Sequence, residues 1–148
     1  MPPGTTHILL VDDEEVDREV ISRILEGEGY LVVKAGSYQE ALAIFDRRSE
    51  QIDLLISDIS LPHRNGVELA KALLKKNPKL KILLISGWVG AEILEVYGIP
   101  SADRHFLPKP FTAPQLMERV REILETDEVW DWLQPVPKED RLGHSNGE

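Results

Sequence analysis

The amino-acid sequence predicts an α/β fold: an open, doubly wound, five-stranded parallel sheet with helices on both faces. Two observations lead to this fold class. Short apolar segments rich in β-branched residues, typical of strands buried on both faces, recur along the chain. Each is followed by a segment of helical periodicity, giving five strand–helix units of roughly 20 to 25 residues. Such alternation is typical of parallel strands joined by right-handed crossovers.

Five segments are predicted to be strands. They are residues 7–11, 30–34, 52–57 and 81–86, with a weaker pattern at 105–107. Apolar side chains at helical spacing predict the helices between and after them. The stripes are Val16, Val20, Ile24 and Leu25; Ala41, Leu42 and Phe45; Val67, Leu69, Ala70, Leu73 and Leu74; and Leu116, Val120, Ile123 and Leu124.

Capping residues mark the ends of several predicted helices. Gly27 follows the first stripe and is expected to close that helix. Ser37, with Glu40 three residues later, has the pattern of a capping box at the start of the second helix. Asn77-Pro78 ends the third helix, and residues 91–97 predict a shorter fourth one.

The composition fits one globular domain. The 148 residues carry 17 Lys and Arg against 26 Asp and Glu, a formal charge of −9 with neutral His. The absence of Cys excludes disulfides and a thiolate nucleophile, and favours a cytoplasmic location. Because no apolar run could span a bilayer and no basic stripe is present, we expect neither membrane insertion nor direct contact with nucleic acid.

Three regions are predicted along the chain. Residues 1–5 form a disordered leader, residues 6–126 the folded domain, and residues 127–148 a C-terminal extension or linker that is partly disordered. Within the extension, residues 129–133 suggest an extra helical turn. Trp130 and Trp132 cannot share one face of it, because they are two residues apart.

Polar side chains follow four of the predicted strands at their carboxyl ends. Asp12 and Asp13 follow the first strand and Asp58 follows the third, while Ser86 ends the fourth strand and Lys109 follows the fifth. In open α/β sheets the functional crevice lies outside the carboxyl ends of the strands. The sequence therefore predicts that three carboxylates, a hydroxyl and an amine meet at one edge of the sheet.

These groups suit phosphoryl chemistry supported by a divalent cation. Carboxylates held close together repel one another, and Mg²⁺, which prefers oxygen ligands, relieves the repulsion. A carboxylate beside such an ion can attack a phosphoryl group and form an aspartyl phosphate. The hydroxyl of Ser86 would donate to a phosphoryl oxygen, and Lys109 would supply a compact positive charge.

Four stretches resemble the receiver domain of response regulators, the CheY-like family of two-component signal transduction. They are residues 7–14, 54–66, 82–87 and 106–111, and the resemblance covers about residues 6–126. Together they are more specific than any one alone, because they occur in order, each at the end of its strand. The resemblance implies the flavodoxin-like strand order 2-1-3-4-5.

The resemblance also implies a role for each acidic residue of the predicted site. Asp58 would be the phosphoacceptor. Asp13 would bind Mg²⁺ directly and Asp12 mainly through water, with Asp58 and the main-chain carbonyl of Ser60 completing the metal ligands from the protein.

Further residues are assigned by the same resemblance. Ser86 and Lys109 would contact the phosphoryl oxygens, and Phe106 would be the aromatic switch residue, turning into the space that Ser86 leaves on phosphorylation. The bond from Lys109 to Pro110 matches one that is usually cis in the family. Pro62 and Gly66 match turn residues, and Gly66 is expected to adopt a positive φ.

The sequence departs from the commonest receiver pattern in several places. Ser86 stands where Thr is frequent, Gly87 where Ala is more usual, and Leu61 at the usual Met position. Ser60 and Val89 flank the place where a hydrolytic water would sit. Neither is a carboxylate or an amide that could orient water, so we expect a phosphorylated lifetime that is not short.

Simpler explanations exist for each site residue taken alone. The acids at 12–14 suit the start of a helix, Asp58 suits a turn, Lys109 an exposed loop and Phe106 the core. The phosphoacceptor hypothesis fails only if all of these hold together. The four His show no ligand spacing. For Trp88 two placements stay open, exposed near the site or packed beneath the fourth helix.

The leading functional hypothesis is a phosphorylation-dependent signalling switch. A histidine kinase or phosphotransfer protein would phosphorylate Asp58, and no substrate would turn over, so the protein is not expected to be an enzyme. One alternative is a phosphatase of the haloacid dehalogenase type, but those enzymes place a second Asp where this chain has Ser60. Another is a pseudo-receiver, which has no chemical reason to keep the whole set of site residues.

The sequence leaves the output of the switch open. No effector domain is recognised after Thr126, so the chain is either a stand-alone receiver or a domain of a longer protein such as a hybrid kinase. The surface expected to change is made by the fourth helix, the fifth strand and the fifth helix, and a homodimer would form through the same face.

Overall fold

Five parallel strands form one sheet in the order β2-β1-β3-β4-β5, as predicted. The structure is a computed structural model that describes residues 5–48, 50–99 and 104–127. The strands are β1 (His7–Val11), β2 (Leu31–Ala35), β3 (Leu54–Asp58), β4 (Lys81–Ser86) and β5 (Phe106–Pro108). The doubly wound α/β class is therefore confirmed.

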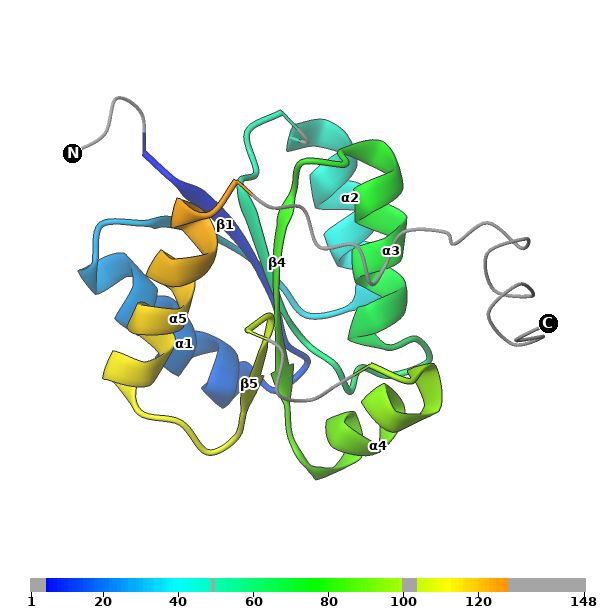
Figure 1. Cartoon of the computed structure of the whole chain (residues 1–148). Coiled ribbons are helices and arrows are strands. Elements are labelled where there is room, and N and C mark those ends of the chain that lie inside the picture. Colours follow the sequence, from blue (N-terminus) through cyan, green and yellow to red (C-terminus); the bar gives the residue numbers. More distant parts are fainter. Residues whose placement is uncertain (1–4, 49, 100–103, 128–148) are drawn as a thin grey trace, which may run out of the picture.

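In the part of the chain that the structure describes, five helices cover the two faces of the sheet (Figure 1). They are α1 (Glu15–Gly27), α2 (Tyr38–Arg48), α3 (Gly66–Lys76), α4 (Trp88–Tyr97) and α5 (Ala113–Glu125). Helices α1 and α5 lie together on one face, and α2 and α3 lie on the other (Figure 1). Each crossover thus brings the chain back to the same end of the sheet, and all five strands have their carboxyl ends at one edge.

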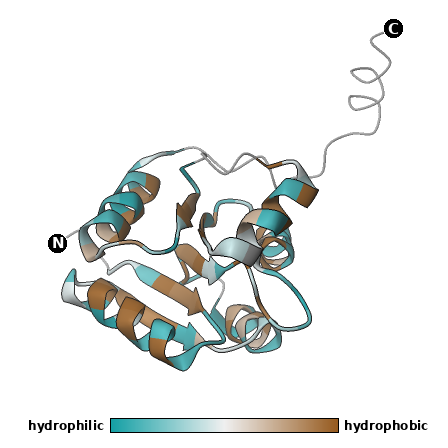
Figure 2. Cartoon of the chain, turned by 90° about the horizontal axis from the view of Figure 1, so that it is seen from below, coloured by the Kyte–Doolittle hydropathy of each residue, from teal (hydrophilic) through white to brown (hydrophobic). Residues whose placement is uncertain are grey.

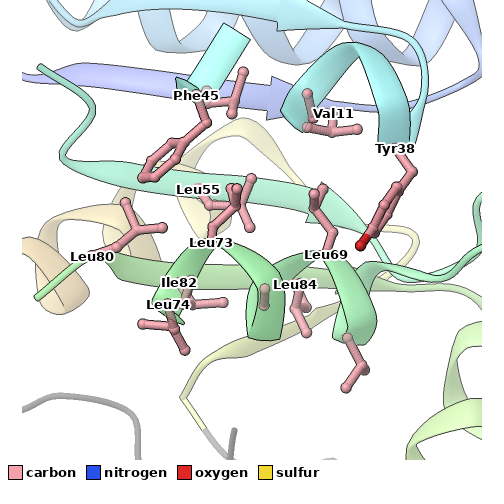
Figure 3. Close-up of a cluster of buried hydrophobic side chains, with 14 of the residues drawn as sticks. Val11, Tyr38, Phe45, Leu55, Leu69, Leu73, Leu74, Leu80, Ile82 and Leu84 are labelled. Atoms are coloured by element: carbon pink, nitrogen blue, oxygen red, sulfur yellow. The ribbon is translucent and has the colours of Figure 1, made fainter. Parts of the chain in front are cut away.

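Consecutive residues of the central strands point into two different apolar cores. Leu9, Leu55 and Leu84 belong to the core beneath α2 and α3, which Figure 3 shows in part. Their neighbours, such as Leu10 and Leu83, belong to the core beneath α1 and α5. The apolar stretches of the strands in Figure 2 follow from this arrangement, because strands buried on both faces cannot alternate apolar and polar residues.

The boundaries of some elements differ from the predicted ones by a few residues. Helix α4 begins at Trp88, three residues before the predicted start, because Gly87 is its N-cap and its carbonyl accepts from the N–H of Ala91 at 3.0 Å. Trp88 lies at the surface, with 84% of its area exposed, which decides between its two predicted placements.

One predicted conformation was wrong. Gly66 does not adopt a positive φ, and the described residue of the preceding loop that does so is His63, with φ 71°. A Cβ atom at Gly66 would lie 2.5 Å from the backbone carbonyl oxygen of Asp58. Glycine is required there for close backbone approach rather than for its left-handed conformation.

Parts of the predicted domain division lie outside the described residues. Residues 1–4 and 128–148, including the predicted helical turn at 129–133 and both of its Trp residues, are not described. The boundaries at residues 5 and 127 therefore stay predictions. Within the described residues, no helix has the length and apolar character needed to cross a membrane.

Candidate functional site

The strand register places the predicted site residues at the same level. Val11 is aligned with Ser57, Asp58 with Ile85, and Ser86 with Pro108. Asp12, Asp58, Ser86 and Lys109 accordingly lie at or just past the ends of four adjacent strands. Backbone hydrogen bonding continues beyond the strands, since the N–H of Lys109 donates to the carbonyl of Ser86 at 2.8 Å.

Three carboxylates converge at this edge of the sheet. Asp12, Asp13 and Asp58 each offer an oxygen, and these oxygens lie within 4.8 Å of one another. Asp12 and Asp58 are buried, whereas Asp13 is exposed. The cluster is open to solvent on the side of Asp13. A cation bound to these carboxylates could therefore keep several water ligands.

Asp12 carries the clearest sign that the cluster suits a cation. One oxygen, Oδ1, accepts from the N–H of Glu14 at 2.9 Å, but Oδ2 is buried and has no hydrogen-bond partner among the described residues. Desolvation raises the pKa of Asp12 to about 6; the bond from Glu14 opposes this shift and the charge of Asp58 adds to it. A buried, unpaired carboxylate oxygen fits a metal ligand, or a group one water away from a metal.

Asp58 is held by two donors that occupy different oxygens. Its Oδ1 accepts from the N–H of Ser60 at 2.9 Å, and its Oδ2 accepts from the Lys109 ammonium at 2.9 Å. The N–H of Ser60 thus contacts the carboxylate of Asp58, and the predicted role of the Ser60 carbonyl as a metal ligand stays a prediction. The two donors fix the orientation of the carboxylate toward the cluster.

Lys109 provides the positive charge of the site. Burial lowers the pKa of its ammonium, but the hydrogen bond to Asp58, the charges of Asp58 and Asp12 and a further bond to Asp17 outweigh burial and raise it. Lys109 is therefore charged at neutral pH. The peptide bond to Pro110 is cis, as the resemblance implied.

Asp17 is a member of this group that sequence reasoning missed. Its Oδ2 lies 3.3 Å from the Lys109 ammonium, and it comes from a different element, α1. An acid in the first turn of a helix is explained by the helix dipole alone, so its type gave no signal. Asp17 lies four residues after Asp13, which is about one helical turn. This spacing was the signal that could have placed Asp17 near the acid cluster.

Ser86 ends β4 at the same edge of the sheet as the cluster, whereas Phe106 lies two residues before the end of β5, aligned with Leu84. Ser86 is buried, and its hydroxyl donates to the carbonyl of Gly87 at 3.3 Å. Phe106 is buried in the core beneath α2 and α3, together with Leu94 of α4. The simpler explanation of Phe106 as a core residue therefore holds in this structure, and its role as a switch stays a prediction.

The fold and the site together define a class of α/β domain, a doubly wound parallel sheet whose carboxyl edge combines buried acids with a paired lysine. Comparison with known proteins specifies it further. The model of the response regulator receiver domain family matches residues 8–121, and the chain belongs to this family. The predicted recognition is confirmed, and with it a place in two-component signalling.

Individual relatives agree with the family. The chain is 37% identical over 123 residues to the sensor kinase CckA of Brucella abortus, covering 82% of this chain and 13% of that protein. It is 36% identical over 117 residues to the transcriptional regulatory protein CpxR of Escherichia coli K12, covering 79% of this chain and 48% of that protein. The chain thus spans less than half of these two relatives, which carry further regions.

The fold comparison gives the same result. The crystal structure of a response regulator receiver protein from Sinorhizobium medicae matches with a TM-score of 0.72 and 29% sequence identity. The match covers 84% of this chain and 98% of that chain. In contrast to the two longer relatives, almost the whole of the Sinorhizobium medicae chain is covered by the match.

Proposed function

We propose that the protein is a phosphorylation-dependent switch in which Asp58 accepts a phosphoryl group from a histidine kinase or a phosphotransfer protein. The observation that carries the proposal is the ion pair between Asp58 and Lys109, 2.9 Å long, formed within a cluster of three carboxylates. A buried acid whose neighbours include both like charges and a flexible ammonium is suited to receive a charged group.

The transfer step follows from this geometry. A carboxylate oxygen of Asp58 attacks the phosphorus atom of phosphohistidine, the new oxygen–phosphorus bond forms as the phosphorus–nitrogen bond breaks, and the imidazole leaves with the electron pair and takes up a proton. Lys109 moves from the free carboxylate to the phosphoryl oxygens. Ser86, at the end of the neighbouring strand, donates its hydroxyl to another of these oxygens.

The acid cluster fits Mg²⁺. Asp12, Asp13, Asp58 and the main-chain carbonyl of Ser60 would hold the ion, with the unpaired Oδ2 of Asp12 facing it directly or through water. The ion would neutralise charge on the phosphoryl oxygens. This assignment rests on the hard oxygen donors of the cluster, which suit Mg²⁺ better than metals that prefer nitrogen or sulfur.

The response is proposed to start at Ser86. Its hydroxyl makes one long hydrogen bond to Gly87, so turning it toward the phosphoryl group breaks little. Since Phe106 is already buried, its ring would fill the released space by a short displacement rather than by moving in from solvent. The surface of α4, β5 and α5 would change as a result, and it is the face we propose for a downstream partner or for a homodimer.

The proposal includes no substrate turnover, and a labelling experiment tests it. The protein is incubated with Mg²⁺ and acetyl phosphate, and its intact mass and Trp fluorescence are followed. We expect one phosphoryl group per chain, and none in Asp58→Asn. The control is Asp46→Asn, which removes an exposed acid of α2 that pairs with Lys76, far from the cluster.

Three results would contradict the proposal. Labelling of Asp58→Asn to the level of the wild type would place the acceptor elsewhere. Steady release of phosphate from small phosphate esters, many times per chain, would support a phosphatase of the haloacid dehalogenase type instead. An unlabelled wild type with Mg²⁺ bound would be a pseudo-receiver.

A further inference from the structure

Lys109 contacts two carboxylates that have different positions relative to solvent. Its ammonium lies 2.9 Å from Oδ2 of Asp58 and 3.3 Å from Oδ2 of Asp17. The exposed fractions of the three side chains increase outward, from 8% for Asp58 through 29% for Lys109 to 47% for Asp17. Asp17 therefore stands on the solvent side of the ammonium, and Asp58 on the buried side.

We propose that Asp17 is a specificity-determining residue of the phosphoacceptor site, which selects against phosphodonors of high negative charge by holding Lys109 and by adding a carboxylate at the entrance. The inference rests on the proposed function of Asp58. It concerns how fast different donors react, whereas the proposed function concerns whether Asp58 reacts at all.

Two physical effects act in the same direction. The ammonium has three N–H donors, and each one engaged by Asp17 is withdrawn from the phosphoryl oxygens of an incoming donor. The carboxylate of Asp17 also repels that donor directly. The Oδ2 atoms of Asp17 and Asp58 both contact the Lys109 nitrogen, at 3.3 Å and 2.9 Å. These two oxygens are therefore at most about 6 Å apart, so the charge of Asp17 acts on the donor at short range.

The helix dipole does not account for this contact. Both acids in the first turn of α1, Glu15 and Asp17, favour the helix through the dipole. Asp17 contacts Lys109, and none of the contacts that the structure gives for the described residues joins Glu15 to it. Glu15→Gln is therefore a matched control, since it removes one charge from the same helical turn.

The test compares two donors of different charge. Acetyl phosphate is a dianion near pH 8, and phosphoramidate carries less negative charge because its nitrogen is partly protonated. Phosphorylation rates are measured for the wild type and for Asp17→Asn, Asp17→Glu and Glu15→Gln at low ionic strength with saturating Mg²⁺. Thermal unfolding of each variant checks that the fold is intact.

We expect Asp17→Asn to accelerate both reactions, by about threefold for each unit of negative charge on the donor, the Coulomb effect of one charge about 6 Å away in water. The ratio of the acetyl phosphate rate to the phosphoramidate rate should therefore rise, and the gain should shrink in concentrated salt. Asp17→Glu and Glu15→Gln should keep a ratio close to that of the wild type.

The outcomes separate selection from simple positioning of the lysine. If Asp17 only orients Lys109, Asp17→Asn slows both donors by the same factor, and the ratio stays constant, which overturns the inference. An unchanged rate with both donors overturns it as well. If the wild type takes no phosphoryl group from either donor, the proposed function itself fails, and this inference fails with it.

Discussion

Burial of Asp12 makes a single residue responsible for part of the response of the protein to pH. The side chain is almost inaccessible, with 1% of the residue exposed, and desolvation is the main reason that its pKa rises from 3.8 to about 6. The folded protein thus binds this proton more tightly than the unfolded chain does. The resulting stabilisation is complete below the unfolded pKa and is lost as the pH rises through the folded value.

Replacing Asp12 by Asn should therefore stabilise the protein when no divalent cation is bound. At pH 7 in EDTA we expect Asp12→Asn to raise the free energy of unfolding by about 1–3 kcal/mol, because a buried charge is replaced by a neutral amide of the same shape. The fall in stability between about pH 4 and pH 6 should also diminish. Urea unfolding across this pH range measures both effects.

Mg²⁺ provides the control for this prediction. The wild type should gain stability when Mg²⁺ is added, because only the folded state assembles the acid cluster, and Asp12→Asn should gain less. Wild-type pH dependence retained in full by Asp12→Asn would show that another group is responsible.

At the level of single residues, the sequence predicted the members of the site better than their contacts. Asp12, Asp58 and Lys109 were predicted because each follows a strand that the hydrophobic pattern defines, and strand ends share an edge in any parallel sheet. Asp17 was missed because it lies within a helix, where a surface acid needs no special explanation. Which acid contacts the lysine depends on the rotation of α1, which periodicity fixes only approximately.

Among the connections between elements, the loop from β3 to α3 depends on a single glycine, Gly66. The N–H of Gly66 donates to the carbonyl of Ile59 at 2.7 Å, which brings the start of α3 against the end of β3. Asn65 caps α3 just before it, in a reciprocal capping box with Glu68. This packing leaves no room for a side chain at Gly66 and holds the backbone at Asp58 and Ile59 in place.

Gly66→Ala should accordingly destabilise the protein. The added Cβ would lie 2.5 Å from the backbone oxygen of Asp58, so the loop has to move, at a cost of about 1–3 kcal/mol in the free energy of unfolding. Gly27→Ala at the end of α1 is the control, since nothing lies within 4 Å of its Cβ position, and it should be neutral or slightly stabilising. Urea unfolding of both variants, followed by labelling with acetyl phosphate, is the measurement.

Equal stability of the two alanine variants would contradict this account of Gly66. The sequence predicted a turn glycine at this position, but the predicted reason, a positive φ, was wrong. Both a positive φ and a close backbone approach favour glycine, so the residue type alone does not distinguish them. The close approach at Gly66 depends on how near the backbone at the end of β3 lies, which is known only from the folded structure.

For the whole molecule, alternation of strands and helices was enough to predict a parallel, doubly wound sheet. Periodicity does not determine the order β2-β1-β3-β4-β5, because it is equally consistent with other orders, and only the family resemblance predicted it. Exact ends were also beyond the pattern: β5 is short, and the predicted 105–107 is displaced by one residue from Phe106–Pro108. Such ends depend on hydrogen bonds to the neighbouring strand.

The same topology leads us to expect that the response to phosphorylation runs through the half of the molecule that contains β4, α4 and β5. Ser86 ends β4 and is followed at once by Gly87, the N-cap of α4, while the Lys109 N–H is bonded to the Ser86 carbonyl. The proposed movement of Ser86 would therefore act directly on α4 and on the end of β5. Helix α2 packs instead against α3 and against β1 and β2, which lie on the other side of β3 from β4.

Amide hydrogen exchange should show this asymmetry when beryllofluoride and Mg²⁺, which mimic the phosphoryl group, are added. We expect exchange to change by up to about tenfold in α4 and in the segment from Phe106 to Lys109, and to stay constant in α2, because coupling free energies between sites are of the order of 1–3 kcal/mol. Asp58→Asn should show neither change, since it cannot form the adduct. Equal changes in α2 and α4 would mean that the response spreads through the whole sheet, and the route through Ser86 would then be wrong.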